Sequence, residues 1–296
     1  MERILVTGAA GYIGSHVVNV LLDMGYAVVA ADLDLENVDD RAEKCSCNIL
    51  NEEDLYVKFG EPDVLIHMAW RNGFVHNAES HILDLPMHYM FIKQMVDSGV
   101  KRVSVMGSMH EIGYYEGAID ENTPQNPSSL YGISKNALRQ SLIALSKTTP
   151  FQLNWLRGFY IMGDDKRNHS IFAKILQKAE EGEKTFPFTT GVNQYDFIDV
   201  DELSLEIALA SVQTEITGII NCCSGKPVAL KDKVEDFISR HGLEMTLRYG
   251  AFPDRPYDSK IIYGDNARIR KIAENYVATH SGDVAEASKK LLHKLT

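Results

Sequence analysis

The stretch Gly8-Ala9-Ala10-Gly11-Tyr12-Ile13-Gly14 directly follows the apolar run Ile4-Leu5-Val6. This pattern predicts a buried strand that turns tightly into a helix. The first glycine allows the turn, the second lets the backbone approach a phosphate, and the third lets the helix lie close to the strand. Free N–H groups at such a helix start bind anions. The stretch therefore predicts a site for the pyrophosphate of a dinucleotide, bordered by Gly8, Gly11, Tyr12, Ile13 and Gly14.

A second apolar run, residues 27–31, ends at Asp32. This is the spacing expected for the carboxylate that accepts hydrogen bonds from an adenosine ribose. The alternative is a solvated loop acid, because residues 34–40 are rich in acidic side chains. No Lys or Arg lies between Asp32 and Arg41 to neutralise a 2′-phosphate. The sequence therefore predicts NAD or NADP as the cofactor and favours NAD.

Length and composition indicate an ordinary globular protein. The 296 residues are long enough for one large α/β core with a smaller lobe, and 45% are hydrophobic and 24% charged. No apolar run approaches the ~20 residues that span a bilayer, and no signal segment is recognisable, so we expect a cytoplasmic protein without membrane contact. The net charge of −11 disfavours nucleic acid as a partner.

The cysteines and histidines give no metal-binding pattern. The four cysteines form Cys45-Ser46-Cys47 and the adjacent pair Cys222-Cys223, and neither spacing is that of a zinc or redox motif. The ten histidines are scattered, without a pair at metal-ligand spacing. We therefore expect reduced thiols and no metal ion.

Short apolar runs alternate with segments of helical periodicity along the first half of the chain. Strands are expected at 64–67, 103–106 and 151–156, and helices at 83–98 and 135–147. Such alternation predicts an α/β protein with a Rossmann-type doubly wound parallel sheet. Beyond residue 164 the pattern predicts a helix at 170–182, an extended stretch at 195–200, a helix at 200–212 and a strand at 218–222. We expect an NAD(P)-binding domain at 1–165 and mainly a smaller C-terminal substrate-binding lobe at 166–296, with about 193–224 returning to the core.

Tyr131 and Lys135 are four residues apart, on one face of a predicted helix. A nearby ammonium stabilises a phenolate, so we expect Lys135 to lower the pKa of Tyr131 and fit it for proton exchange with a sugar hydroxyl or carbonyl. Taken alone, this spacing is usually only a surface pair. Here it accompanies the glycine turn, Asp32, and Ser108 just beyond the strand at 103–106.

Together these motifs resemble the extended short-chain dehydrogenase/reductase family, the sugar-nucleotide epimerases, dehydratases and reductases. The resemblance covers nearly the whole chain, including Asn48-Ile49, His67-Met68-Ala69, the segment 108–113, Arg157-Gly158-Phe159 and the segment 196–200. It implies that Tyr131 is the general acid/base and that Lys135 lowers the pKa of Tyr131 and holds the nicotinamide ribose. It also implies that Ser108 forms a hydrogen bond with the substrate oxygen. It also implies cofactor contacts from Asn48, Ile49, Met68, Ala69 and Trp70, and a homodimer formed through the helix after Tyr131.

Departures from the family pattern narrow the expected reaction. Family dehydratases carry an Asp-Glu pair after the catalytic Ser/Thr, where this chain has Met109 and His110. Glu111 lies one residue too late and is expected to point to another face, so dehydration is not expected. Tyr160 stands where many members have an Asn that contacts the substrate diphosphate. Tyr160 is therefore a candidate substrate contact, and we expect the diphosphate to be bound differently from the way it is bound in members with the Asn.

The segments 106–113 and 70–88 resemble a subgroup that reduces nucleotide-linked 4-keto-6-deoxy sugars, including those that form 6-deoxytalose. His110 either contacts the substrate or is satisfied by backbone groups, whereas structural roles are favoured for His76, His81 and His88. Trp70 either walls the cofactor cleft or belongs to the core.

The smaller lobe offers two candidate binding groups for a diphosphate, Arg255 and the pair Arg167 and His169. The alternative is that these side chains are exposed surface groups without a ligand. Gln194 is expected near the sugar or base by resemblance alone.

We therefore expect NAD(P)H-dependent reduction of the 4-keto group of a nucleotide-diphospho-4-keto-6-deoxy-sugar. An NAD-dependent 4-epimerase is the alternative, and a non-catalytic NAD(P)-binding subunit is a third possibility that the set Ser108, Tyr131 and Lys135 disfavours.

Overall fold

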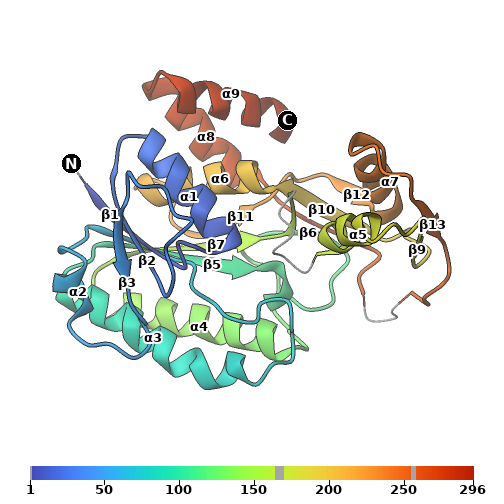
Figure 1. Cartoon of the computed structure of the whole chain (residues 1–296). Coiled ribbons are helices and arrows are strands. Elements are labelled where there is room, and N and C mark those ends of the chain that lie inside the picture. Colours follow the sequence, from blue (N-terminus) through green and yellow to red (C-terminus); the bar gives the residue numbers. More distant parts are fainter. Residues whose placement is uncertain (1, 164–169, 255–257) are drawn as a thin grey trace.

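The larger part of the molecule is a parallel sheet of seven strands between two layers of helices (Figure 1). The computed structural model describes residues 2–163, 170–254 and 258–296. The strand order is β11-β7-β5-β4-β1-β2-β3, and every neighbouring pair is parallel. The strands are β1 (Arg3–Thr7), β2 (Ala27–Asp32), β3 (Glu43–Ser46), β4 (Val64–His67), β5 (Arg102–Ser108), β7 (Gln152–Gly158) and β11 (Gly218–Cys222). The predicted doubly wound Rossmann-type fold is confirmed.

Helices cover both faces of this sheet, which explains why its strands are apolar runs rather than alternating ones. Val6 and Ile66 pack against one helix layer, and their neighbours Leu5 and Leu65 pack against the other. The first layer contains α1 (Tyr12–Asp23), α6 (Val200–Val212), α8 (Ala267–Thr279) and α9 (Asp283–Leu295). The second contains α2 (Leu55–Lys58), α3 (Ser80–Ser98) and α4 (Leu130–Ser146). Figure 1 shows the two layers above and below the sheet.

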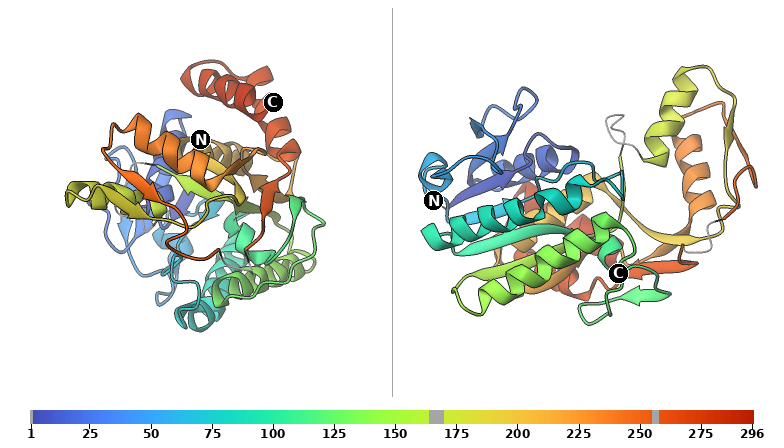
Figure 2. Two further views of the ribbon diagram at one scale, coloured as in Figure 1. Left: turned by 90° about the vertical axis from the view of Figure 1, so that its right-hand side faces the viewer. Right: turned by 90° about the horizontal axis from the view of Figure 1, so that it is seen from below.

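The smaller lobe is built around a mixed sheet of short strands. Its path is β12-β10-β14-β6, with β8 paired to β10, and β13 pairs with β9 in a separate ribbon. The strands are β6 (Gly117–Ile119), β8 (Tyr160–Met162), β9 (Thr185–Pro187), β10 (Gln194–Asp199), β12 (Pro227–Ala229), β13 (Thr246–Arg248) and β14 (Ile261–Gly264). The helices are η1 (Met109–Glu111), α5 (Ile171–Glu180) and α7 (Leu230–Arg240). The right view of Figure 2 shows α5 and α7 standing apart from α3 and α4.

The expected elements agree closely with those observed. The strands at 64–67 and 218–222 and the helix at 200–212 have the predicted bounds, and α4 begins earlier than predicted, at Leu130. The packing of α8 and α9 on α6 and α1 was not expected, because the sequence pattern suggested only a lobe for the C-terminal residues.

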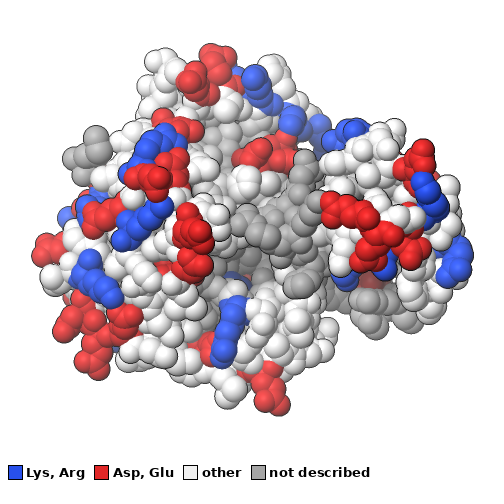
Figure 3. Space-filling view, in the orientation of Figure 1, with Lys and Arg blue, Asp and Glu red and all other residues white. Residues whose placement is uncertain are grey.

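Acidic and basic side chains are mixed on the face shown in Figure 3, and acidic ones gather around the end where α2 lies. This distribution agrees with the net charge of −11. Among the residues that the structure describes, no helix is both long and apolar enough to cross a bilayer.

Candidate active site

The glycine turn between β1 and α1 has the geometry that a dinucleotide requires. Gly8 adopts a φ of +71°, and a Cβ there would lie 2.6 Å from the backbone nitrogen of Ala69. A Cβ on Gly14 would overlap the carbonyl oxygen of Gly8. Gly11 is the residue before α1, and within the described residues no side chain caps this helix start. The backbone N–H groups of the first turn therefore fit a phosphate.

Asp32 ties the end of β2 to the glycine turn. Its Oδ2 accepts a hydrogen bond of 3.0 Å from the Ala10 backbone nitrogen, and its Oδ1 accepts one of 2.8 Å from Leu33. The side chain is half-buried, so it is not a fully solvated loop acid. Arg41 is occupied by two carboxylates, because its Nη1 lies 2.7 Å from Asp23 Oδ1 and its Nη2 lies 2.8 Å from Asp39 Oδ2. The turn and Asp32 together fit a dinucleotide.

The other predicted cofactor contacts follow β3 and β4, which lie on opposite sides of β1 in the sheet. Asn48 and Ile49 follow β3, where Asn48 Oδ1 accepts from the Leu50 backbone and Ile49 is buried. Met68 and Ala69 follow β4, and the Met68 nitrogen donates to the Thr7 carbonyl at 3.1 Å. These positions lie at the carboxyl edge of the parallel sheet, as a dinucleotide site in this fold requires.

Tyr12 and Ile13 open α1, and both side chains are half-buried. A Cβ on Gly163 would overlap the Tyr12 hydroxyl, so the first turn of α1 meets the residue that follows β8. The start of the cofactor helix thus contacts the chain that leads into the smaller lobe.

Ser108 and Tyr131 come together because β5 ends where α4 begins. Ser108 is the last residue of β5, and its Oγ accepts from the His110 backbone nitrogen at 3.3 Å. Ser129 caps α4, with its Oγ 3.2 Å from the Gly132 nitrogen. A Cβ on Gly132 would overlap the His110 carbonyl oxygen, so α4 approaches η1 closely. This approach brings Tyr131 within hydrogen-bond reach of Ser108.

Lys135 lies one turn beyond Tyr131 and is buried. Its Nζ donates to the carbonyl oxygen of Met106 at 2.8 Å and lies 5.9 Å from the centre of the Tyr131 ring. Burial lowers the pKa of Lys135 to about 7, against the opposing effect of the Glu111 charge.

The pKa of Tyr131 differs from the expectation. Burial raises it to about 12, the hydrogen bond with Ser108 lowers it, and the Glu111 carboxylate raises it further. The predicted lowering by Lys135 is wrong for this structure, because desolvation of the phenolate is the largest effect and Lys135 donates to Met106 instead. The phenol is therefore protonated near neutral pH.

An aromatic group surrounds the phenol. The ring of His76 stacks on that of Tyr131 with centroids 5.6 Å apart and an interplanar angle of 12°, and the His110 ring lies 4.3 Å from His76. Burial lowers the pKa of His110 to about 4, so its imidazole is neutral. Tyr160 lies 6.4 Å from His110, and Tyr195 lies 4.4 Å from Tyr160. His110 and Tyr160 thus lie beside the predicted catalytic residues, whereas the placement of His76 there was not expected.

Trp70 belongs to the site as well as to the core. Its ring centroid lies 4.0 Å from Lys135 Nζ, and the ring stacks on His88 at 4.5 Å and 13°. His88 Nδ1 is 3.0 Å from His67 Nε2, and His67 Nδ1 is 2.9 Å from Thr7 Oγ1. His88 thereby links the Trp70 ring to His67 on β4. Sequence spacing could not reveal the stack, since it depends on how α3 packs beside β4.

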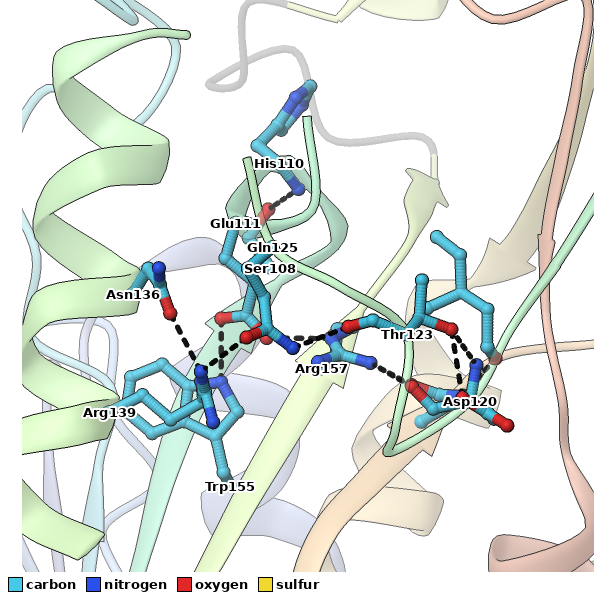
Figure 4. A network of polar contacts seen from close by, with 12 residues as sticks. Ser108, His110, Glu111, Asp120, Thr123, Gln125, Asn136, Arg139, Trp155 and Arg157 are labelled. Carbon is cyan, nitrogen blue, oxygen red and sulfur yellow. Dashed lines mark hydrogen bonds and ion pairs between the residues drawn. The ribbon is translucent and has the colours of Figure 1, made fainter. Parts of the chain in front are cut away.

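Glu111 points away from Ser108, as expected from its position in the sequence. It is fully buried, and its carboxylate accepts from Trp155 Nε1 at 2.7 Å and from Arg157 Nε at 2.6 Å (Figure 4). Arg157 Nη1 also donates to Asn221 Oδ1 and the Asp120 carbonyl. The turn that carries His110 is thereby fixed to β7 and β11. Only the acidic residue itself was visible in the sequence, not its two partners.

The smaller lobe holds the remaining candidates. Gln194 lines a cavity of about 430 Å³ with Tyr114, Lys260 and Ile261, and the described lining does not include Ser108, Tyr131 or Lys135. The prediction that Gln194 contacts the sugar or base of the substrate stays a prediction. Candidates outside the described residues are Arg167, His169 and Arg255.

Asp196 lies in the motif at 196–200 and is a structural residue. Its carboxylate accepts from Ser224, from the Gly225 backbone at 2.9 Å and from the Gly264 backbone at 3.0 Å. The four cysteines are free. Over the described ranges, no three His, Cys, Asp or Glu side chains are placed to hold a metal ion.

Comparison with known protein sequences finds a family and two relatives that resemble this chain. A sequence model described as the NAD dependent epimerase/dehydratase family matches residues 4–223. The chain is 43% identical over 268 residues to the dTDP-6-deoxy-L-talose 4-dehydrogenase (NAD(+)) of Aggregatibacter actinomycetemcomitans, covering 88% of this chain and 99% of that protein. It is 26% identical over 275 residues to a putative UDP-glucose 4-epimerase of Methanocaldococcus jannaschii, covering 87% of each.

The solved structures agree on the fold. A UDP-N-acetylglucosamine 4-epimerase from Methanobrevibacter ruminantium superimposes with a TM-score of 0.81 at 20% identity, over 99% of this chain and 97% of that one. A UDP-glucose 4-epimerase from Thermotoga maritima gives 0.79 at 21% identity, over 99% and 98%. At this identity the likeness concerns the fold alone. With the family match over residues 4–223 and the relative at 43% identity, the chain belongs to the NAD-dependent epimerase/dehydratase family of extended short-chain dehydrogenases/reductases.

Proposed function

We propose that the protein reduces the 4-keto group of a nucleotide-diphospho-4-keto-6-deoxy-sugar. The observation that carries the proposal is the grouping of Ser108, Tyr131 and Lys135 beside the dinucleotide turn. It occurs in a chain that is 43% identical to a relative named for 4-dehydrogenation of a dTDP-6-deoxy sugar. Reduced nicotinamide would supply the hydride.

Tyr131 supplies the proton in this proposal. A phenol whose pKa is about 12 is fully protonated near neutral pH, which is the form needed to protonate the oxygen at C4 as that oxygen gains negative charge. The Ser108 hydroxyl donates a hydrogen bond to the same oxygen and stabilises the developing charge. Lys135 then stabilises the phenolate that remains on Tyr131. A 4-epimerase would begin with oxidation at C4, in which Tyr131 accepts the proton, and would then return the hydride to the other face of the sugar.

We infer NAD rather than NADP as the cofactor. Gly8, Gly11 and Gly14 would hold the pyrophosphate, and Asp32 would accept hydrogen bonds from the adenosine ribose. A 2′-phosphate would meet the Asp32 carboxylate, and Arg41 is occupied by Asp23 and Asp39. Asn48, Ile49, Met68, Ala69 and Trp70 are proposed to border the rest of the dinucleotide.

On the substrate side, the proposed contacts are His110 and Tyr160, with Arg167, His169 and Arg255 proposed to bind the diphosphate. The methyl group of such a sugar would pack against the neighbouring rings of His76, His110 and Tyr160. We divide the chain functionally at about residue 165, with 193–224 in the core, and assign α8 and α9 to the helix layer of the larger part.

We further propose a homodimer in the cytoplasm. Exposed apolar side chains on α3 and α4 support the dimer, and these are Ile82, Leu83, Met90 and Ile133. Four free cysteines agree with a reducing compartment. Analytical ultracentrifugation of wild type and Met90→Lys tests the dimer: a sedimentation coefficient of a monomer for wild type would contradict it.

The function is tested by mixing the purified protein with NADH or NADPH and a panel of nucleotide-linked 4-keto-6-deoxy sugars. Loss of reduced-nicotinamide absorbance in proportion to product is the result expected for the reductase. Interconversion of nucleotide sugars without net consumption of cofactor would show the 4-epimerase instead.

A further inference from the structure

The buried Lys135 has an aromatic partner as well as a polar one. Its Nζ donates to the Met106 carbonyl at 2.8 Å and lies 4.0 Å from the centroid of the Trp70 ring. An ammonium group at this distance from an indole ring is attracted by the negative potential of the ring face. Lys135 is only 3% exposed, so little water competes with this attraction.

The indole is held in place by two histidines. Trp70 Nε1 donates to His81 Nδ1 at 3.0 Å, so His81 Nδ1 carries no proton and the Nε2–H donates to the Val75 carbonyl at 3.0 Å. The ring of Trp70 also stacks on His88, with an interplanar angle of 13°. One edge and one face of the indole are therefore fixed by α3 and by the loop before it.

The charges around Lys135 show why an aromatic partner matters. Burial disfavours the charged amine and lowers its pKa to about 7. The groups that face it are the Glu111 carboxylate on η1, which favours the charged form, the phenol of Tyr131 on α4, and the imidazoles of His67 on β4 and His88 on α3. Burial lowers the pKa of both histidines well below neutrality, to about 3 for His88, so they are neutral and do not repel the ammonium.

We propose that Trp70 is a positioning residue that keeps Lys135 protonated and holds its ammonium group in place one helical turn from Tyr131. This inference rests on the proposed function only in that Lys135 acts in catalysis. The contact between Lys135 and Trp70 is a separate claim that can be tested in the protein without substrate or cofactor.

The first test is the pH dependence of tryptophan fluorescence between about pH 5 and 9. The chain has two tryptophans, Trp70 and Trp155. Loss of the charge on the ring face of Trp70 should change its emission as Lys135 deprotonates near pH 7. We expect an inflection in wild type that is absent from both Lys135→Met and Trp70→Phe. The same inflection in Lys135→Met would assign it to a histidine and overturn the proposal.

The second test compares the pH profile of kcat/KM for Trp70→Phe and Trp70→Leu. Leucine excludes water but offers no ring face, so the alkaline fall in activity should move about one pH unit toward acid. Phenylalanine keeps a ring face and should leave the fall within a few tenths of a unit of wild type. If kcat/KM of Trp70→Leu falls at the same pH as that of wild type, whatever its magnitude, Trp70 only fills space and the proposal is wrong.

The two tests separate the proposals. Melting temperatures and circular dichroism identify a variant that does not fold, and Lys135→Arg, whose charge does not titrate in this range, then replaces Lys135→Met in the fluorescence test. If wild type reduces no nucleotide sugar, the proposed function fails. The fluorescence titration still supports or overturns the contact.

Discussion

The carboxylate of Glu111 accepts a hydrogen bond of 2.6 Å from the guanidinium of Arg157, and neither side chain is exposed to solvent. Trp155 Nε1 donates to the other carboxylate oxygen at 2.7 Å. A buried pair of this kind is costly to break, because removing one charge leaves the other without compensation. Since Glu111 directly follows His110, the pair also fixes the turn that carries a proposed substrate contact.

We expect Glu111→Gln to lower the free energy of unfolding by about 3–5 kcal/mol. Urea denaturation followed by circular dichroism measures this value. Glu43→Gln is the matched control: Glu43 is paired with Arg3 at the surface, so its loss should cost less than about 1 kcal/mol. Equal effects of the two variants would mean that the buried pair does not hold the turn.

Tyr131→Phe should reduce kcat by at least about 100-fold, because it removes the phenol that supplies the proton to the substrate oxygen. The fold should be unaffected, since Tyr131 packs among rings that phenylalanine can also contact. Steady-state kinetics and the melting temperature measure the two effects. Tyr249→Phe, at an exposed tyrosine bonded to Glu235, is the control and should retain wild-type activity. Unchanged turnover in Tyr131→Phe would exclude the proposed role.

Asp32→Asn should weaken NADH binding roughly tenfold or more, since a charged acceptor for the ribose hydroxyls is replaced by a neutral amide. It should also narrow the difference between NADH and NADPH, because a 2′-phosphate would no longer meet a carboxylate. Titration of each cofactor by calorimetry checks both effects. Asp34→Asn provides the control, since Asp34 is exposed and accepts a hydrogen bond from the nearby Glu36 backbone. Identical affinities for wild type and Asp32→Asn would place the ribose elsewhere.

Glu206 makes the stability depend on pH. It is fully buried in α6, and burial raises its pKa well above the usual value. The folded protein therefore holds a proton that the unfolded chain releases above about pH 4, so this contribution to stability is present at low pH and is lost as the pH rises toward the folded-state pKa.

We expect Glu206→Gln to remove this dependence. The difference in unfolding free energy between the variant and wild type should grow by up to about 1.4 kcal/mol per pH unit between pH 5 and 7. Glu202→Gln, at the half-buried start of the same helix and paired with Lys294, should show no such slope. A constant difference between Glu206→Gln and wild type would mean that Glu206 is charged in the folded protein.

The sheet was predictable because its strands and turns are specified by short runs of neighbouring residues. Apolar runs such as 64–67 are buried on both faces, and the turn at Gly8 needs a positive φ that only glycine adopts readily. The pairing of Tyr131 with Ser108 followed from family resemblance, since no spacing links a residue on α4 to one on β5.

The remaining parts of the site depend on tertiary packing. The contact of Trp70 with Lys135 and the partners of Glu111 join residues from different elements, and no sequence period encodes them. The pKa of Tyr131 was predicted in the wrong direction because spacing reveals a neighbouring charge but not the loss of hydration around the phenol. The packing of α8 on α6 was missed because it also depends on contacts between distant elements.

The central claim is most directly tested by following the hydride. NADH carrying deuterium at both C4 positions of the nicotinamide is incubated with the protein and a nucleotide-diphospho-4-keto-6-deoxy-sugar, and the product is examined by mass spectrometry and NMR. The account predicts one deuterium at C4 of the sugar for each NADH oxidised, and no transfer in Tyr131→Phe. Formation of C4 epimers from nucleotide sugars without net NADH oxidation would contradict it and establish a 4-epimerase.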